Sequence, residues 1–315
     1  DFQFYKTYFE LTDDPNEGDV GFLPMTLNYY INNNQMQLVD SFVNKMDKLC
    51  KKVVIWVDGD NDVNYSKSNC ILIKYSGYKS NNKINEFIMP GDLKIDLLDK
   101  YFSGKVVIRE KLLIPSVGFI GIAEYPKIKL ILLIFKNMLL QFIYFIKKSI
   151  FEPSLIIPYL IKRKKILKKI MNDARINSNV MIRNRFAFGI RDNNRKARME
   201  FINNIVNNDY SICMRGAGNY SIRFYETLCL GRIPIFINTD CILPFEDIIN
   251  WKKHCIWIEE SEIQNMEEKI VEFHQNINNS DFLELQQKNR IIWEKYFSIQ
   301  GFNRQLYIYI NNIVI

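Results

Sequence analysis

The 315-residue sequence contains only two histidines, His254 and His274. Histidine-rich metal sites are therefore excluded, and a Ser-His-Asp hydrolase would have to recruit one of these two side chains. The six cysteines form no CxxC pair and follow no metal-ligand spacing, so we expect them to be reduced core residues. These absences argue against a function built on histidine, structural zinc or disulfides.

The sequence also lacks a recognisable secretion signal, because no basic segment followed by an apolar stretch is found near its start. A long apolar run, LILLIFKNMLLQFIYFI, is interrupted by Lys136, Asn137 and Gln141, and it falls short of the roughly 20 clean residues of a spanning helix. We therefore expect a cytoplasmic protein. The run over 128–146 and the basic stretch KRKKILKK at 162–169 leave two alternatives: peripheral attachment to anionic lipid at the inner face of the membrane, or packing of the run into the core.

The overall composition is that of a folded, mildly basic protein. A hydrophobic content of 48% over 315 residues is enough for two ordinary domains. The formal charge of +7 is modest, and the basic residues are not interleaved with aromatic side chains as in single-stranded nucleic-acid sites. We therefore expect no nucleic-acid partner.

Apolar strands alternate with amphipathic helices along the chain. VVIW at 53–56 and ILIKYS at 71–76 are typical of buried parallel strands, and SVGFIGI at 116–122 begins a second such series. This alternation predicts an α/β fold with ligands at the carboxyl ends of the strands. We assign 1–111 to an N-terminal acceptor-side lobe, 112–280 to a C-terminal donor lobe, and 281–315 to helices that pack back on the N-terminal lobe.

The segment CMRGAGNYSIRFYETLCLGRIPIFINTDCILPFEDIINW, residues 213–251, combines features of an anion site. A strand leads into a glycine-rich turn, where positive φ angles and close backbone approach would direct the N–H groups of the next helix to an anion. Arginines add forked donors for phosphate, polar side chains cap the helix or bind the same anion, and a carboxylate can accept hydrogen bonds from sugar hydroxyls. The residues concerned are Arg215, Gly216, Gly218, Asn219, Ser221, Arg223 and Glu226, to which Arg183, Arg185 and Arg191 add charge from upstream.

This order of strand, glycine-rich turn, SIRFYE, GRIPIFI and LPFEDIINW, followed by WEKYF at 293–297, resembles the exostosin family of glycosyltransferases in its short bacterial or viral form. The resemblance is strongest over 180–300. It implies a GT-B fold, in which two Rossmann-like lobes face a cleft, and transfer from a nucleotide sugar with inversion at the anomeric carbon. By position, Arg223 and Glu226 match the diphosphate and ribose contacts of the family, and Pro244 and Phe245 match a loop near the nucleotide.

We expect a UDP-sugar as the donor and a glycan or a lipid-linked glycan as the acceptor. A leaving diphosphate is stabilised by a divalent metal or by fixed cations, and the arginines supply the second, so we expect no required metal or cofactor. A carboxylate must accept the proton of the acceptor hydroxyl, and Asp14 and Glu124 are our candidates.

Two alternatives remain open. The DGDND stretch contains Asp58 and Asp60 after an apolar strand, which is also the pattern of a metal-dependent GT-A transferase. Because the base is not assigned, the chain could also be a non-catalytic module that binds a nucleotide or a carbohydrate.

Overall fold

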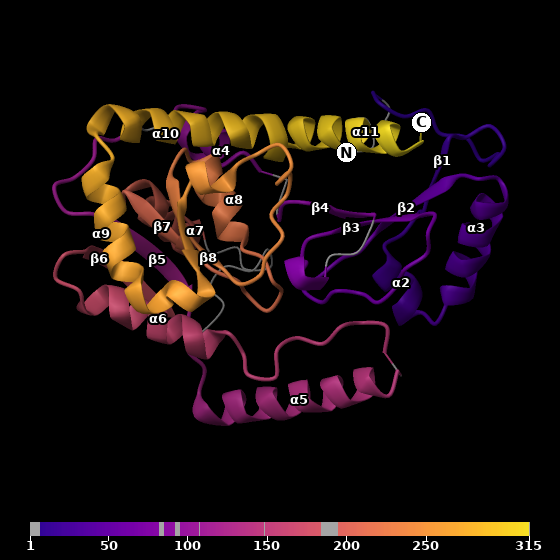
Figure 1. Cartoon of the computed structure of the whole chain (residues 1–315), viewed down its shortest axis with the longest axis horizontal. Coiled ribbons are helices and arrows are strands. Elements are labelled where there is room, and N and C mark those ends of the chain that lie inside the picture. The colour runs from indigo at the N-terminus through magenta and orange to yellow at the C-terminus, as the bar shows by residue number, and fades with distance from the viewer. Residues whose placement is uncertain are drawn as a thin grey trace.

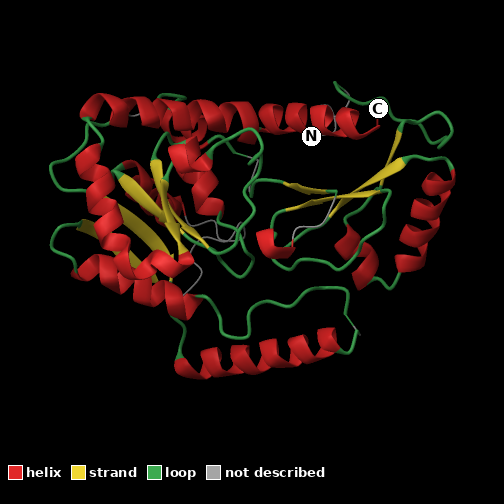
Figure 2. Ribbon diagram, in the orientation of Figure 1, coloured by secondary structure: helices red, strands yellow, loops and turns green. Residues whose placement is uncertain are grey.

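The computed structural model describes residues 7–81, 85–91, 95–106, 108–147, 149–183 and 195–314. Two separate parallel sheets form two lobes (Figures 1 and 2). The N-terminal sheet has the order β1–β2–β3–β4, and the C-terminal sheet has the order β6–β5–β7–β8–β9. The predicted α/β class with two Rossmann-like lobes is therefore confirmed.

The N-terminal sheet consists of β1 (Val20–Phe22), β2 (Lys52–Trp56), β3 (Cys70–Lys74) and β4 (Glu86–Ile88). Side chains alternate across it, so that Val53 and Ile55 face a core with α2 (Leu27–Asn32) and α3 (Met36–Lys48). The next residue, Val54, faces Phe302 and other apolar residues of α11 (Ile299–Val314) on the opposite side. Both faces are covered, which explains the continuous apolar runs.

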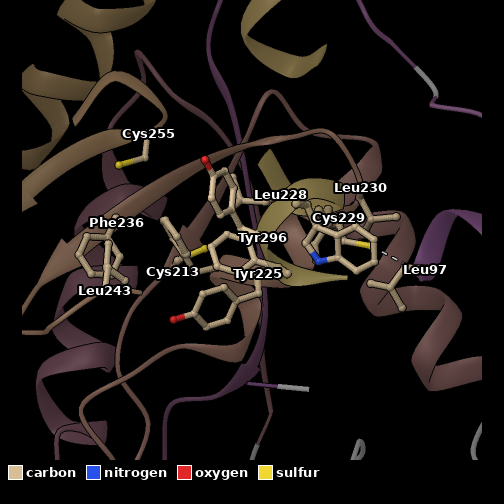
Figure 3. Packing of buried hydrophobic residues seen from close by; sticks show 14 of the residues in the cluster. Leu97, Cys213, Tyr225, Leu228, Cys229, Leu230, Phe236, Leu243, Cys255 and Tyr296 are labelled. Carbon is tan, nitrogen blue, oxygen red and sulfur yellow. Dashed lines mark hydrogen bonds between the residues drawn. The ribbon is translucent and has the colours of Figure 1, made fainter. Parts of the chain in front are cut away.

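The C-terminal sheet consists of β5 (Ser116–Ile122), β6 (Asn177–Arg183), β7 (Tyr210–Cys213), β8 (Ile233–Asn238) and β9 (Ile256–Glu259). One face packs against α6 (Leu160–Asn172) and α9 (Met266–Asn276). The other packs against α4 (Leu97–Phe102), α7 (Arg195–Val206) and α8 (Ile222–Cys229). Figure 3 shows this second core, in which Cys213, Cys229 and Cys255 lie among aromatic and aliphatic side chains.

All six cysteines are free thiols, as expected. Five of them are buried, but Cys50 is exposed in the turn after α3 and has a φ of 56°. The prediction of a core position is therefore wrong for Cys50, because the chain reverses there before β2 begins.

The lobe boundaries differ from the predicted ones at two places. Residues 95–106 and 108–111 pack on the C-terminal lobe: Leu97 and Leu98 enter its core, and Asp96 forms an ion pair of 2.6 Å with Arg290. The segment 281–315 is also divided. Helix α10 (Asn279–Ile292) packs on the C-terminal lobe, a π-helical turn follows at Trp293–Phe297, and α11 crosses to the N-terminal lobe.

The carboxyl ends of the strands of the two sheets face each other. The loop after β3 pairs with the loop after β8 through a bridge between Tyr78 and Cys241, and Lys79 N donates to Asp240 O at 2.9 Å. Helices α10 and α11 run end to end across both lobes on one side, and α5 (Lys127–Phe145) lies on the opposite side (Figure 1). The segments that follow the strands of both sheets therefore meet between the lobes.

Candidate functional site

The order in which successive strands are added to the C-terminal sheet reverses between β5 and β7. These strands are neighbours, with Val117 opposite Tyr210 and Gly118 opposite Ser211. Helix α6 follows β5 on one face of the sheet, and α7 leads into β7 on the other face. Ligands of doubly wound sheets bind outside the carboxyl ends of the strands at such a point.

Arg223 of α8 lies directly at this point. Its guanidinium group stacks on the Phe119 ring of β5, with 3.9 Å from Cζ to the ring centroid. Nη2 donates to the carbonyl of Ile120, and Nη1 donates to the carbonyl of Ile212 at 3.4 Å. Its Nε is buried and has no hydrogen-bond partner. Arg223 therefore ties together the ends of β5 and β7 and retains an unused donor.

Arg163 of α6 joins the same place from the other face. Its Nη1 donates to the carbonyl of Ile122 at 2.8 Å, and its Nη2 donates to the carbonyl of Arg215. Arg215 follows β7, is 5% exposed, and lies 5.4 Å from the ring of Tyr78 and 5.9 Å from that of Tyr159. In both arginines Nε is buried without a hydrogen-bond partner, and so is the Tyr159 hydroxyl. We call Arg163, Arg215 and Arg223 the arginine cluster.

The electrostatics of the arginine cluster favour an anion. Burial lowers the pKa of Arg163, and burial together with the nearby charge of Arg163 lowers the pKa of Arg223 to about 10. Within the described residues, no carboxylate pairs with any of the three guanidinium groups, whereas Arg198 pairs with Glu226 and Arg290 pairs with Asp96. Buried cations without a counter-charge are costly. A bound diphosphate would supply both the charge and the missing acceptors.

Sequence reasoning missed Arg163, because it stands in the basic stretch at 162–169. A signal was present: Arg163 shares a helical face with Ile166, Leu167 and Ile170, which are buried. The lysines around it form ion pairs with the C-terminal lobe, Lys162 with Glu260, Lys164 with Glu124 and Lys169 with Glu267. Helix α6 is therefore packed on this lobe through one face, while Lys165 and Lys168 stay exposed.

The glycine-rich turn differs from the prediction. Neither Gly216 nor Gly218 has a positive φ. A Cβ at Gly218 would lie 2.6 Å from the Tyr220 ring and 2.8 Å from the carbonyl oxygen of Asp60, so the close approach is to the N-terminal lobe. At Gly216 an added Cβ would meet open space.

The polar side chains of this turn, Asn219 and Ser221, do not make the helix-capping hydrogen bonds that the sequence suggested. The Asn219 amide donates to the carbonyls of Gly77 at 3.0 Å and Thr239 at 3.1 Å, which joins the two lobes. Ser221 is the N-cap of α8, but its side chain makes no capping hydrogen bond. Neither side chain therefore caps the helix, and the other half of the expectation, donation to a bound anion, stays a prediction.

The remaining donor-site candidates lie at different distances from the arginine cluster. Glu226 is held by Arg198 at 2.7 Å, one helical turn after Arg223, and Arg183 ends β6 and pairs with Glu200 at 2.6 Å. Arg185 and Arg191 lie outside the described residues. Pro244 accepts a hydrogen bond from the Trp251 indole, and Phe245 packs on Phe87, Tyr296 and Phe297. Phe245 thus belongs to the packing between the lobes, Pro244 is held within the C-terminal lobe, and a nucleotide contact by either residue stays a prediction.

The two base candidates have different positions. Asp14 is fully exposed in the turn before β1, where hydrogen bonds from Asn16 lower its pKa. Lys51, which precedes β2, binds the carbonyls of the same turn, so Asp14 lies at the amino ends of the strands, away from the cleft. The structure therefore does not support Asp14 as the base. Glu124 follows β5 and pairs with Lys164, next to Arg163, so it lies near the arginine cluster.

Asp58 and Asp60 follow β2 and face the C-terminal lobe. The backbone of Asp58 exchanges hydrogen bonds with the Asn28 amide, and Asp60 accepts a hydrogen bond of 2.9 Å from the Tyr220 hydroxyl. Within the described residues, no group of three or more His, Cys, Asp or Glu side chains is arranged to hold a metal. The two separate sheets contradict the GT-A alternative, whereas Asp60 lies at the carboxyl end of a strand that faces the glycine-rich turn.

The two lobes with facing strand ends form a GT-B type fold, and the arginine cluster lies in its C-terminal lobe. Residues 162–273 match the family model of the Exostosin GT47 domain. This range includes Arg163, Arg215 and Arg223.

Relatives of this domain are found among animal proteins. Exostosin-1 of Drosophila melanogaster is 29% identical over 106 residues, which cover 34% of this chain and 13% of that protein. The Exostosin-1 homolog of Caenorhabditis elegans is 30% identical over 111 residues, covering 35% and 28%. The match thus spans less than a third of either relative. Among solved structures, TarM is similar with a TM-score of 0.37 and 14% identity over 83% of this chain and 50% of that one.

Proposed function

We propose that the protein is an inverting glycosyltransferase that moves a sugar from a UDP-sugar to a glycan or a lipid-linked glycan. The arginine cluster is the observation that carries this proposal. Three guanidinium groups lie where the strand order of a doubly wound sheet reverses, and each has a buried Nε without a hydrogen-bond partner. This arrangement matches a site for a diphosphate.

The chemistry follows from these positions. When the anomeric carbon is attacked, its bond to the diphosphate oxygen breaks and negative charge develops on the leaving group. Fixed cations in a buried site stabilise that charge without reorganisation, so we expect turnover without a required divalent metal. Glu226 lies one turn from Arg223 on α8 and pairs with Arg198. We propose that its carboxylate binds the ribose hydroxyls while it keeps part of its ion pair with Arg198.

The acceptor hydroxyl requires a carboxylate to take its proton, and one from the N-terminal lobe can face the donor site from the other side. We propose Asp60 for this role, because it lies at the carboxyl end of β2 and already accepts a hydrogen bond from Tyr220, five residues after Arg215. The acceptor oxygen would bond to the anomeric carbon as its proton passes to the Asp60 carboxylate. Glu124 is the competing candidate and is held by Lys164.

The first test is binding and turnover of nucleotides by the purified chain. UDP, GDP, CDP and a panel of their sugars are compared by calorimetry and thermal shift with and without EDTA, since a ligand of the native state raises the melting temperature. We expect UDP to bind best, EDTA to have little effect, and a UDP-sugar to be consumed when acceptor is present. Binding without any hydrolysis or transfer would favour the non-catalytic alternative, and no nucleotide binding would overturn the proposal.

The location is part of the proposal. A cytoplasmic enzyme that uses a lipid-linked acceptor would work as a peripheral protein at the inner face of a membrane. Fractionation of cells that express the chain, followed by transfer assays with soluble and lipid-linked acceptors, tests both points.

A further inference from the structure

Helix α5 has its polar and apolar sides reversed relative to a helix of a water-soluble protein. It spans Lys127–Phe145 and has a mean hydropathy of 1.7, yet only 6% of its most apolar stretch is buried. Eight large apolar side chains on its outward side are each at least half exposed. They form what we call the α5 outer face: Ile128, Ile131, Leu132, Phe135, Met138, Leu139, Phe142 and Phe145.

The polar residues of α5 point to the protein instead. Asn137 is buried, and its amide donates to the carbonyls of Leu155 at 2.8 Å and Ile156 at 3.4 Å in the segment that returns along the helix. Gln141, one turn later, donates to the carbonyl of Ser154 at 3.2 Å. Asn137 and Gln141, which interrupt the apolar run, therefore attach the helix to the segment 154–156 that follows it. Because their side of the helix faces the protein, the apolar side faces solvent.

Both ends of α5 are attached to the folded lobes. The helix begins five residues after β5 ends, next to the arginine cluster. After the helix, Ile150 accepts a hydrogen bond of 2.8 Å from Asn64 N, and Glu152 N donates to the carbonyl of Asp62 at 2.8 Å in the N-terminal lobe. Helix α5 thus lies lengthwise along the body (Figure 1). Although 19 residues are long enough to cross a bilayer, this attachment at both ends favours a helix that lies in the interface.

The charged side chains of the α5 segment itself are all basic. Lys129, Lys136 and Lys147 are exposed at its borders, and residues 127–147 contain no Asp or Glu. A second copy docked through the same face would bring these lysines together without a counter-charge, whereas anionic lipid headgroups would neutralise them. In the basic stretch of α6, which the sequence suggested for this role, three of the six basic residues form ion pairs within the C-terminal lobe.

We propose that the α5 outer face inserts into the surface of an anionic lipid bilayer and is framed there by the lysines of the same segment. The apolar side chains would enter the boundary between headgroups and acyl chains. The lysines would remain at the headgroup level. This docking does not depend on the transferase activity, and it would hold the carboxyl end of β5 close to the membrane.

Vesicle flotation tests the proposal with the full chain. Vesicles of phosphatidylcholine alone and with about 30% phosphatidylglycerol are used at low and high salt, because screening weakens the electrostatic part. We expect flotation with anionic vesicles at low salt and weaker flotation at high salt. In the α5 variant, Leu132, Phe135, Leu139 and Phe142 are changed to Ser. We expect this variant to bind at least about 100-fold more weakly, since each buried side chain contributes to partitioning.

Matched variants separate this effect from a general change of the surface. A control with Leu38, Met171, Ile248 and Ile291 changed to Ser removes four exposed apolar residues from other faces, and it should float like the wild type. Changing Lys129, Lys136 and Lys147 to Gln should weaken binding by up to about fivefold for each lysine. The same change at Lys67, Lys253 and Lys295 should have little effect. Circular dichroism and the UDP-induced thermal shift check that each variant is folded.

Three results would overturn the proposal. The wild type could remain unbound with anionic vesicles at low salt, or the α5 variant could float as well as the wild type. The third is a wild-type dimer in light scattering that becomes a monomer in the α5 variant while vesicles are ignored. That result would make the α5 outer face an interface between copies.

Discussion

Arg163 donates a hydrogen bond from Nη2 to the main-chain carbonyl of Arg215, which is 52 residues later in the chain. This bond joins α6 to the end of β7 and holds two cations on the same side of the sheet. Arg223 reaches the carbonyl of Ile120 from the opposite layer. Two helices from different faces of the sheet therefore preorganise one positively charged site before any ligand binds.

The first prediction concerns Arg163. Arg163→Ala should weaken UDP binding by about 10- to 100-fold, because a hydrogen bond to a charged group contributes about 1.5 to 3 kcal/mol. Arg163→Lys should fall between the wild type and Ala, since it keeps the charge but loses the forked donors. Calorimetry with UDP measures both. Arg175→Ala is the control, because Arg175 pairs with Asp173 and Glu268 at the surface. This variant should bind UDP like the wild type.

Arg223→Ala should reduce both activity and stability. Its guanidinium group is buried, stacks on Phe119 and bonds to the carbonyls of Ile120 and Ile212. Removing it deletes two buried hydrogen bonds from a charged group, at a cost of about 1.5 to 3 kcal/mol each. Chemical denaturation should show this loss, and saturating UDP should rescue little of it. A folded Arg223→Ala variant with normal stability and normal turnover would contradict the site.

The sequence predicted the sheets well, because buried parallel strands have continuous apolar runs. Strands β3 and β8 are buried at every residue and were recognised from ILIK and IPIFI. The roles of individual polar residues depended on tertiary contacts that local patterns do not contain. Asn219 could equally cap a helix or join the lobes, and only the position of Gly77 decided between them. Asn137 interrupted an apolar run, but its burial against Leu155 required the returning loop.

The N-terminal lobe contributes the base in our proposal, and paired variants test it. Asp60→Asn should lower kcat by about 100- to 10,000-fold with little change in UDP affinity, because the proton acceptor is lost while the donor site remains. Glu124→Gln should have a much smaller effect if Glu124 serves only as the partner of Lys164. Steady-state kinetics across pH measures both. The reverse order of effects would transfer the role to Glu124.

Acid should destabilise the protein through its two histidines. Burial lowers the pKa of His274 below its usual value of 6.5, and burial also lowers that of His254. His274 is satisfied as the neutral ring, with Nε2 donating to the carbonyl of Leu112 at 2.8 Å and Nδ1 accepting from the Tyr210 hydroxyl at 2.9 Å.

The sign of this effect follows from proton binding. The unfolded chain takes up protons near pH 6.5 and the folded chain only at lower pH, so the contribution to stability is present above pH 6.5 and is lost as the pH falls through the folded pKa. Urea unfolding between pH 7.5 and 5 should show a slope of up to about 1.4 kcal/mol per pH unit for each histidine. The slope should be smaller in His274→Gln, whereas the surface change Lys269→Gln should leave it unaltered. An unchanged slope in His274→Gln would show that His274 does not contribute.

The glycine-rich turn offers a pair of substitutions that differ only in position. Gly218→Ala should destabilise the protein, because the new Cβ would lie 2.6 Å from the Tyr220 ring and 2.8 Å from the Asp60 carbonyl oxygen. We expect a cost of about 1 to 3 kcal/mol and a lower melting temperature.

Gly216→Ala should leave the melting temperature of the free protein unchanged, since nothing lies within 4 Å of its new Cβ. The space beside Gly216 adjoins Arg215, so a bound diphosphate would meet the added methyl group there. Gly216→Ala should therefore weaken UDP binding while the fold is kept, and calorimetry beside thermal unfolding measures the two effects separately. If Gly216→Ala binds UDP like the wild type, the ligand does not approach this turn, and the diphosphate must lie on the Arg163 and Arg223 side of the arginine cluster.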